Sequence, residues 1–320
     1  MIVTRLTDMF NLSVPLVLAP MGGVSGGQLA AAVSNAGGLG LVGGGYGDTD
    51  WLAREIALVR EGTRKPWGVG LITWAVTTAT VEQVLASGPS AVMLSFGDPR
   101  PFGRLINNAG CRLICQVQDI EGAILAQEAG ADLIVAQGTE AGGHGGTRST
   151  LPFVPAVVDL VAPTPVVAAG GIADGRGLAA ALMLGAHGAL IGTRYYASHE
   201  ALGSAMAKRR ITGSLGLSTV RTRVFDLVRG YDWPQGYTGR ALRNGFTSRW
   251  DGQEAELRTA LPAQNAAYQK AVAAEDCDTA VVWASEAVDL ITHIESAASI
   301  TARLAQEAEM YLAHGAQLLR

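Results

Sequence analysis

The chain has 320 residues, of which 48% are hydrophobic and only 16% are charged, and its formal net charge is -4. This length is ample for one large core, or for a barrel with a smaller domain. The composition excludes the basic stripe of a nucleic-acid-binding surface, and the short basic run at 208–210 is typical of a solvated helix end.

The cysteines Cys111, Cys115 and Cys277 are odd in number and lack the spacing of a disulfide framework. Cys111 and Cys115 lie in an apolar run, so we expect them to be small core residues. The N-terminal stretch lacks the apolar region of a signal peptide. No stretch reaches the roughly 18 apolar residues of a membrane-spanning helix. We therefore expect a cytoplasmic protein without a membrane segment.

Eight short apolar runs follow one another along the first part of the chain. They are LVLAP from Leu16, LGLV from Leu39, WGVGLI from Trp67, AVMLSF from Ala91, RLICQV from Arg112, LIVAQG from Leu133, PVVAAGG from Pro165 and GALIGT from Gly188. Each run is almost continuously apolar rather than alternating. This pattern is typical of strands that are buried on both faces of a parallel sheet.

Helix patterns lie between these runs. An Ala-rich segment ends at Gly37, and the next segment opens on Asp48 or Asp50 as its N-cap and closes at Gly62. Segments 119–132 and 174–188 repeat this design. The strand-loop-helix unit recurs about every 20 to 33 residues, which predicts an α/β fold of the (β/α)8 TIM barrel type. A doubly wound open sheet is the competing architecture.

The pattern changes after Tyr195. Residues from about 212 to 250 are richer in Arg, Trp, Tyr and Gly, and two helical stretches follow, around Gln253 to Ala274 and from Ser285 to the end. We predict a smaller helical domain at 215–282, acting as a lid or substrate domain. Residues 1–214 and 283–320 then form a discontinuous barrel domain.

In such barrels, chemistry is expected at the carboxyl ends of the strands. After the first run comes APMGGVSGG, whose backbone can closely approach a flat ligand, although a plain glycine turn explains it too. After the seventh and eighth runs come AAGGIADG and IGTRY, where Thr193 adds a hydroxyl donor. This pair of glycine-rich loops favours a phosphorylated ligand, with tight strand-helix contact as the alternative.

The loop after the sixth run, VAQGTEAGGHGG, holds Gln137 at the strand end and then Glu140 and His144 among glycines. His144 is a candidate functional residue, with a structural loop histidine as the alternative. The other histidines lie at helix ends or in helical contexts and are expected to be structural or at the surface: His187, His199, His293 and His314. No third ligand accompanies Glu140 and His144, so no metal site is expected. No nucleophile elbow is present, which disfavours a Ser/His/Asp hydrolase.

The motifs APMGGVSGG, VAQGTEAGGHGG, VVAAGGI and GALIGTRY, in this order, resemble the nitronate monooxygenase family, formerly called 2-nitropropane dioxygenases. The later VRTRVFD…WP…GRALRN…W is similar too, so the resemblance covers most of the chain. Flavin-dependent enoyl reductases of fatty-acid synthesis share the element GxEAGGHxG. The resemblance implies an FMN-binding TIM barrel with a smaller helical domain over the active site.

The resemblance also implies which residues contact the cofactor. Four strand-end loops would supply the flavin contacts and the phosphate site: Ala19, Pro20 and Met21 at the ring, Gln137, Ala141 and Gly142 from the sixth strand, and Gly170, Gly171, Gly192 and Thr193 at the phosphate. Gln116 stands where some members have lysine, and Gly70 where some have asparagine. Both positions are expected to contact the flavin, and the two departures from the family pattern point to a different subclass. His144 would be the active-site histidine.

The activity implied by the resemblance is the oxidation of small alkyl nitronates. FMN passes electrons to O2, and the products are a carbonyl compound and an oxidised nitrogen species of the nitrite type. A nitronate needs only a donor for its oxygens, whereas a neutral nitroalkane needs a base. Imidazole, with a pKa near ~6.5, suits either task. Trp74, Met21 and Tyr residues of the second domain are expected to help form a small apolar pocket, with a core position as the alternative for Trp74. Glu140 is a candidate to orient His144.

Other readings stay open at this point. An NAD(P)H-dependent flavin reductase of quinone or enoyl substrates would use the same flavin site, and a non-catalytic FMN-binding protein would need no active histidine. An IMP-dehydrogenase-like barrel is disfavoured, because no catalytic Cys loop follows the sixth run. The oligomeric state is open, a homo-oligomer included.

Overall fold

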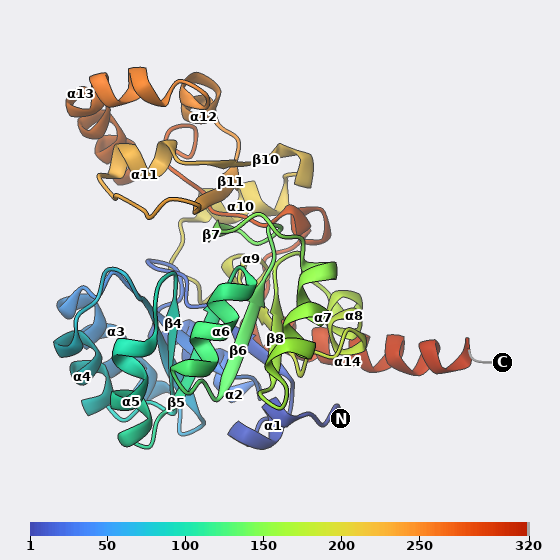
Figure 1. Ribbon diagram of the computed structural model, residues 1–320. Coiled ribbons are helices and arrows are strands. Elements are labelled where there is room, and N and C mark those ends of the chain that lie inside the picture. The colour runs from blue at the N-terminus through green and yellow to red at the C-terminus, as the bar shows by residue number, and fades with distance from the viewer. Residues whose placement is uncertain (319–320) are drawn as a thin grey trace.

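The computed structural model describes residues 1–318, which form a barrel with a smaller lobe above its open end (Figure 1). The barrel strands correspond one by one to the eight apolar runs. They are β1 (Leu16–Leu18), β2 (Gly40–Gly45), β3 (Trp67–Ile72), β4 (Ala91–Ser95), β5 (Arg112–Val117), β6 (Leu133–Gln137), β8 (Val166–Ala169) and β9 (Ala189–Ile191). All are parallel, in the order β1-β9-β8-β6-β5-β4-β3-β2.

Backbone hydrogen bonds at Leu39 close the barrel. Leu18 donates its N–H to the Leu39 carbonyl at 2.9 Å, and Leu39 donates to the Leu16 carbonyl at 2.9 Å. These bonds join β1, at one end of the strand order, to the residue that precedes β2, at the other end. The predicted TIM barrel is therefore confirmed, and the competing open sheet is wrong.

Helices follow the strands around the outside of the barrel (Figure 1). They are α2 (Gly27–Asn35), α3 (Thr49–Gly62), α4 (Thr78–Ala86), α5 (Arg100–Asn108), α6 (Ile120–Glu128), α7 (Thr150–Val161) and α8 (Gly175–Met183). The predicted caps are confirmed at Asp48, Asp119 and Asp174, each of which accepts a hydrogen bond from a backbone N–H of the first turn. Asp48 rather than Asp50 is the N-cap of α3.

Two layers of apolar side chains make up the barrel core, because successive strand residues point to opposite faces. In β6, Leu133 and Val135 point into the barrel, while Ile134 and Ala136 pack against the surrounding helices. The helix α1 (Arg5–Phe10) adds Leu6 and Phe10 to the inner cluster. Burial on both faces explains why the strand sequences do not alternate. The predicted core cysteines Cys111 and Cys115 are buried.

The smaller lobe, which we call the upper lobe, is built mainly from residues 219–273, and Val281 and Trp283 also pack against its apolar cluster. It contains β10 (Thr219–Thr222), α11 (Val224–Arg229), β11 (Thr238–Leu242), α12 (Gly245–Trp250) and α13 (Glu254–Ala273) around its own apolar cluster. The helix α13 matches the helical stretch expected there. The lobe also carries strands beside its helices: β10 and β11 form an antiparallel sheet with β7 (Gly143–Gly145), which comes from the loop after β6.

The C-terminal stretch is not one helix from Ser285 to the end. It begins with the 3-10 helix η2 (Glu286–Leu290), and α14 (Ala297–Gln317) starts only at Ala297 and packs against α8 and α2. Side-chain bonds hold the segment before η2, because Ser285 donates its N–H to Thr193 Oγ1 at 3.0 Å and its hydroxyl to the Glu140 carbonyl at 2.6 Å. Barrel and upper lobe are linked by α9 (Thr193–Tyr196), α10 (Ala205–Thr212) and η1 (Gly216–Ser218).

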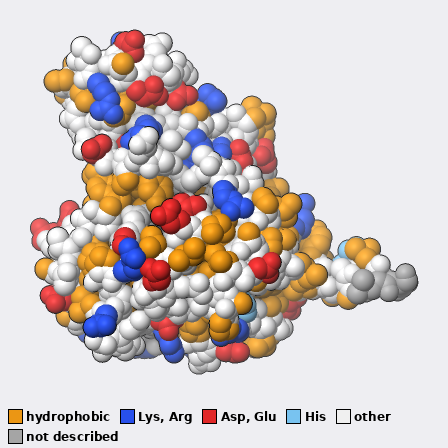
Figure 2. Space-filling view, in the orientation of Figure 1, with side chains coloured by type: hydrophobic (Ala, Val, Ile, Leu, Met, Phe, Trp, Pro, Cys, Tyr) orange, Lys and Arg blue, Asp and Glu red, His pale blue; other side chains and the backbone are white. Residues whose placement is uncertain are grey.

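The space-filling view shows hydrophobic side chains gathered at the waist between the upper lobe and the barrel (Figure 2). This waist lies at the carboxyl ends of the barrel strands, where β7 rises to join the lobe (Figure 1). In the part of the chain that the structure describes, no helix has the length and apolar character needed to cross a bilayer.

Candidate active site

A cavity of about 470 Å³ opens at the carboxyl ends of the barrel strands, beneath the upper lobe. Every residue that the family resemblance assigned to the cofactor or to catalysis lines this cavity. These residues are Ala19, Pro20, Met21, Gly70, Gln116, Gln137, Ala141, Gly142, His144, Gly170, Gly171, Gly192 and Thr193. The structure therefore brings together residues from six strand ends, while their individual roles remain predictions.

Glycines form the cavity walls where the backbone closely approaches other chain segments. A Cβ atom on Gly70 would overlap the ring of Pro20, and one on Gly142 would lie 2.7 Å from the Ala284 carbonyl carbon. Both contacts are too close for any side chain at these positions. Gly70, one of the departures from the family pattern, thus has a local reason: Pro20 occupies the space that a side chain would need.

One end of the cavity is built from the two paired glycine turns. Gly170 and Gly171 adopt positive φ angles of +99° and +74°, which turn the backbone sharply after β8. Beside them, Gly192 and Thr193 begin α9 directly after β9. Thr193 Oγ1 accepts the Ser285 N–H, so the hydroxyl proton is left for another acceptor. Backbone and hydroxyl donors in this position suit an anionic group such as a phosphate.

The neighbouring helix α8 does not line the cavity, and two backbone donors of its first turn are already engaged. Asp174 accepts the Gly177 N–H at 3.1 Å, and Glu307 of α14 accepts the Gly175 N–H at 2.9 Å. An anion at this end of the cavity therefore meets the turn at Gly170 and Gly171 and the start of α9, rather than α8.

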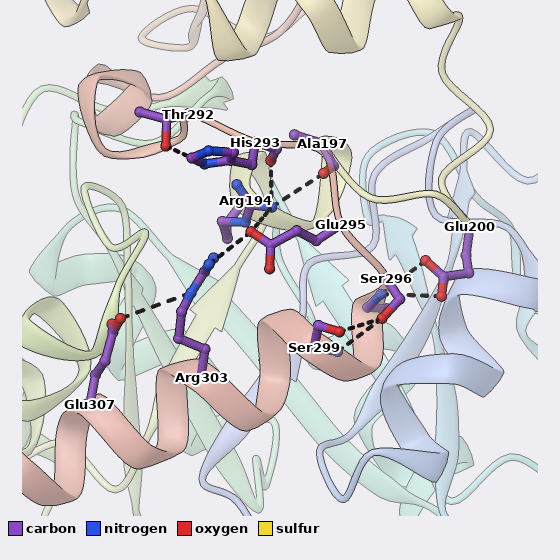
Figure 3. A network of polar contacts seen from close by, with 11 residues as sticks. Arg194, Ala197, Glu200, Thr292, His293, Glu295, Ser296, Ser299, Arg303 and Glu307 are labelled. Carbon is purple, nitrogen blue, oxygen red and sulfur yellow. Dashed lines mark hydrogen bonds and ion pairs between the residues drawn. The ribbon is translucent and has the colours of Figure 1, made fainter.

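A polar network holds α9 in place from behind (Figure 3). Arg194, whose side chain is 1% exposed, donates to the His293 carbonyl at 2.8 Å and lies 3.7 Å from Glu295. Glu295 in turn pairs with Arg303 of α14 at 2.8 Å. Burial lowers the pKa of Arg194 to about 10, against the attraction of Glu295. This network fixes the backbone that follows Thr193.

The backbone of His144 is held on both sides. As the middle residue of β7, it pairs with Gly239 of β11 in the upper lobe. Gln137 donates its side-chain N–H to the His144 carbonyl at 3.0 Å, and Gln118 donates to Gln137 Oε1 at 2.9 Å. The Gln137 amide was expected to contact a bound ring. It lines the cavity, but its polar atoms are engaged in positioning the histidine strand.

The imidazole of His144 has a carboxylate partner in the upper lobe. Its Nε2 atom lies 2.9 Å from both carboxylate oxygens of Asp226, which belongs to α11. The two side chains are 9% and 3% exposed. Burial lowers the pKa of His144, while the hydrogen bond to Asp226 raises it. The net direction is downward, which favours the neutral form of the imidazole.

Sequence reasoning missed Asp226 and considered Glu140 instead as the residue that orients His144. Glu140 is engaged elsewhere: its carboxylate accepts the Thr150 N–H at 3.0 Å and the Thr150 hydroxyl at 2.7 Å, at the start of α7. Asp226 lies 82 positions from His144 in the chain. Asp226 ends the segment VRTRVFD, which contains two arginines. Nothing in this local sequence indicates that the aspartate contacts a histidine of the barrel.

Aromatic side chains form one wall of the cavity, where sequence reasoning expected Trp74 and Tyr residues of the second domain but did not place Tyr46 or Trp233. Trp233 stacks on His144, and Tyr231 stacks on Tyr46 with ring centroids 4.0 Å apart. Trp233 donates its Nε1–H to the Tyr46 hydroxyl at 2.9 Å. The expectation that Trp74 lines the pocket is wrong: it packs edge-on against Tyr46 and Trp233 and stands behind this wall.

The cavity carries one positive side chain. Within residues 1–318, Arg229 is the only arginine or lysine that lines it, and its guanidinium lies 4.8 Å from the Tyr231 ring centroid. The acidic lining residue Asp48 is the N-cap of α3. The cavity thus combines an apolar and aromatic wall, one guanidinium, one imidazole and a turn rich in backbone donors.

Comparisons with known proteins agree on one family. The model of the family described as nitronate monooxygenase matches residues 3–79 and 71–307. A protein named probable nitronate monooxygenase from Staphylococcus saprophyticus is 31% identical, over 93% of this chain and 95% of its own. A protein of the same name from Staphylococcus aureus strain Newman is 32% identical, over 82% and 84% of the two chains.

Solved structures with similar folds point in the same direction. FabK from Thermotoga maritima superposes with a TM-score of 0.87 and 30% identity over the full length of both chains. Nitroalkane oxidase from Streptomyces ansochromogenes superposes with a TM-score of 0.82 and 29% identity, over 98% of this chain and 99% of that one. With the family model and the curated relatives, these matches show that the chain belongs to the nitronate monooxygenase family of flavin-dependent oxidoreductases.

Proposed function

We propose that the protein binds FMN in the barrel mouth and uses it to oxidise alkyl nitronates with O2, giving a carbonyl compound and nitrite-type products. The observation that carries this proposal is the joint placement of two features in one cavity. The donor-rich turn at Gly170 and Gly171 lies at one end, and the imidazole of His144 lies in the wall. The family membership supports the same activity.

The residues present fit FMN. Gly170, Gly171, Gly192 and Thr193 would hold the phosphate, because they offer backbone and hydroxyl donors without side-chain bulk. Flavin contacts would come from the remaining predicted residues: Ala19, Pro20, Met21, Gly70, Gln116, Gln137, Ala141 and Gly142. The cavity volume of about 470 Å³ is typical of cofactor pockets. When bound, the flavin supplies the electron transfer from substrate to O2.

The protein's own side chains bind and orient the substrate. Arg229 attracts the negative charge of a nitronate, and the stacked rings of Trp233, Tyr46 and Tyr231 exclude water from the wall that faces it. Neutral His144 is available to accept the α proton of a nitroalkane, and protonated His144 to donate to nitronate oxygens. We propose that residues 215–282 act as the lid and substrate domain over a barrel domain of 1–214 and 283–320, since Arg229 and Trp233 belong to that range.

The test compares how ethyl nitronate and NADH each reduce the flavin of the purified protein without oxygen. If the proposal is correct, the protein is yellow and releases FMN on denaturation, and ethyl nitronate bleaches its flavin within the turnover time. In air, it consumes oxygen with ethyl or propyl-2-nitronate. A colourless protein that does not bind added FMN, or a flavoprotein without oxygen uptake on nitronates, would contradict the proposal.

A second candidate is an NAD(P)H-dependent flavin reductase of enoyl or quinone substrates. The similarity to FabK, at a TM-score of 0.87 and 30% identity over the whole chain, favours keeping it. The same experiment separates the two candidates. Rapid anaerobic bleaching by NADH or NADPH, with no bleaching by nitronate, would favour the reductase.

A further inference from the structure

We propose that Asp226 is a positioning residue: it holds the imidazole of His144 in the tautomer that carries its proton on Nε2, so that Nδ1 is the nitrogen that meets the substrate. The assignment of a substrate to His144 rests on the proposed function. The tautomer itself is a property of the protein that can be measured without turnover.

The geometry of the pair determines which nitrogen carries the proton. Both oxygens of Asp226 lie 2.9 Å from Nε2 of His144. An ionised carboxylate can only accept hydrogen bonds, so Nε2 must donate. In a neutral imidazole the lone pair then sits on Nδ1. Among residues 1–318, Nδ1 has no hydrogen-bond partner, and it is not among the fully buried polar atoms that lack one. It is therefore the open nitrogen of a ring that lines the cavity.

The carboxylate of Asp226 is dedicated to this contact. The side chain is 3% exposed, and its oxygens have no hydrogen-bond or ion-pair partner other than His144 in the part of the chain that the structure describes. A buried carboxylate with a single partner is costly unless that partner donates a strong hydrogen bond. A substitution that removes the Asp226 charge is therefore expected to affect the His144 imidazole before any other group.

The ring has no second orientation of equal energy. Trp233 covers one face, with ring planes 4° apart, and Trp283 lies against it at 5.1 Å between centroids. Gln137 fixes the backbone carbonyl of the same residue. Turning the ring over would exchange the Nε2–Asp226 bond for a poorer one without gaining a partner elsewhere. The tautomer and the orientation are therefore selected together, as in other carboxylate-imidazole pairs.

The groups around His144 shift its pKa in opposite directions. Asp226 of α11 raises the pKa of His144, while burial, Arg229 of α11 and Arg221 of β10 lower it. The other rings that pack against it, Trp233, Trp283 and Phe96, carry no charge. Asp226 is thus the group that keeps the imidazole basic in an environment that otherwise disfavours protonation.

The chemical consequence concerns neutral nitroalkanes. The α C–H bond breaks, the proton moves to Nδ1 of His144, and the electron pair passes into the nitro group, which gives the nitronate. A preformed nitronate skips this step. Asp226 should therefore matter for nitroalkanes and much less for nitronates, which is a difference that a general loss of structure would not produce.

The test compares wild type with Asp226→Asn. The matched control is Glu55→Gln, which removes another buried carboxylate, one that accepts the Gly27 N–H at 3.0 Å outside the cavity. We expect Asp226→Asn to lower kcat/KM for nitroethane by at least about tenfold, while ethyl nitronate changes by less than about threefold. The rising limb of the nitroethane pH profile should move to lower pH, since the pKa of His144 falls without the carboxylate. Glu55→Gln should change neither the ratio of kcat/KM for nitroethane to that for ethyl nitronate nor the pH profile for nitroethane.

Nitrogen-15 NMR of the histidines, assigned with His144→Gln, measures the tautomer directly. At pH 8 we expect wild-type His144 to show a protonated Nε2 and an unprotonated Nδ1, and Asp226→Asn to lose this preference. A protonated Nδ1 in wild type would overturn the proposal, as would an unchanged nitroethane-to-nitronate ratio in a folded variant. If Asp226→Asn fails to fold, or the wild type does not oxidise nitronates, the wild-type spectrum still shows whether Nε2 of His144 carries the proton, as the contact with Asp226 requires.

Discussion

Trp233 lies flat on the imidazole of His144, with ring centroids 3.5 Å apart and planes 4° apart. The indole takes one face of the imidazole out of water, and burial is the main reason why the pKa of His144 lies below its ordinary value.

Trp233→Ala should therefore raise the pKa of His144 toward its ordinary value of about 6.5. Where neutral His144 is the active form, the rising limb of kcat/KM for nitroalkanes then moves to higher pH, the opposite direction from Asp226→Asn. The pH profile, or histidine NMR, measures the shift. Trp233→Phe keeps a ring on the imidazole and is the control. Identical profiles for Trp233→Ala and wild type would show that the indole does not shield the ring.

Removal of the Arg229 guanidinium from the cavity should weaken nitronate binding. Arg229→Met is expected to raise KM for ethyl nitronate about tenfold with little change in kcat, because a charge-assisted contact to an anion is worth about 1.5–3 kcal/mol. Steady-state oxygen uptake measures both constants. Arg249→Met is the matched control: its guanidinium also lies over an aromatic ring, 4.6 Å from the Trp250 centroid, but outside the cavity. Equal KM values for the two variants would exclude a role for Arg229.

The hydroxyl of Thr193 should contribute to FMN binding. Thr193→Val is isosteric but removes the donor aimed at the phosphate and the acceptor of the Ser285 N–H. We expect the Kd for FMN to rise about tenfold, since a charge-assisted hydrogen bond is lost. Titration of the apoprotein by flavin fluorescence gives the Kd. Thr193→Ser retains the hydroxyl and should bind FMN with the same Kd as wild type. A Thr193→Ser variant that binds FMN weakly would point to the methyl group instead.

The contact between Gly70 and Pro20 predicts a stability difference. Gly70→Ala places a Cβ against the Pro20 ring and should lower the free energy of unfolding by about 1–3 kcal/mol, as overfilled sites do. Gly315→Ala, in the exposed last turn of α14 with open space around the new Cβ, should instead stabilise by about 0.5–1 kcal/mol. Urea unfolding of both variants measures the changes. A Gly70→Ala protein as stable as wild type would mean that Pro20 yields without cost.

The barrel could be predicted from the sequence because each of its strands and caps is locally encoded. Continuous apolar runs specify strands buried on two faces, and aspartates such as Asp119 and Asp174 fix the helix starts. The strand-end loops converge by topology, so Gln137, Gly170 and Thr193 could be assigned to one cavity without knowing any distance.

What the sequence could not predict depends on contacts between distant segments. β7 is the tripeptide Gly-His-Gly, which has no strand propensity and forms a strand only because β11 pairs with it. Asp226 meets His144 because α11 folds over the barrel mouth, and a single sequence does not report that approach. The stretch from Ser285 onward has helical composition, but it forms only the short 3-10 helix η2 before α14 begins at Ala297, while Ser285 itself is bonded to Thr193 and Glu140.

The stretch from Asp226 to Trp233 supplies the carboxylate beside His144, the guanidinium at Arg229 and two aromatic rings of the cavity wall. All of these come from one short, contiguous piece of chain outside the eight barrel strands. Divergence can therefore act on this piece alone. A change of substrate range would then require substitutions only in this piece, with the glycine-rich loops of the barrel left as they are.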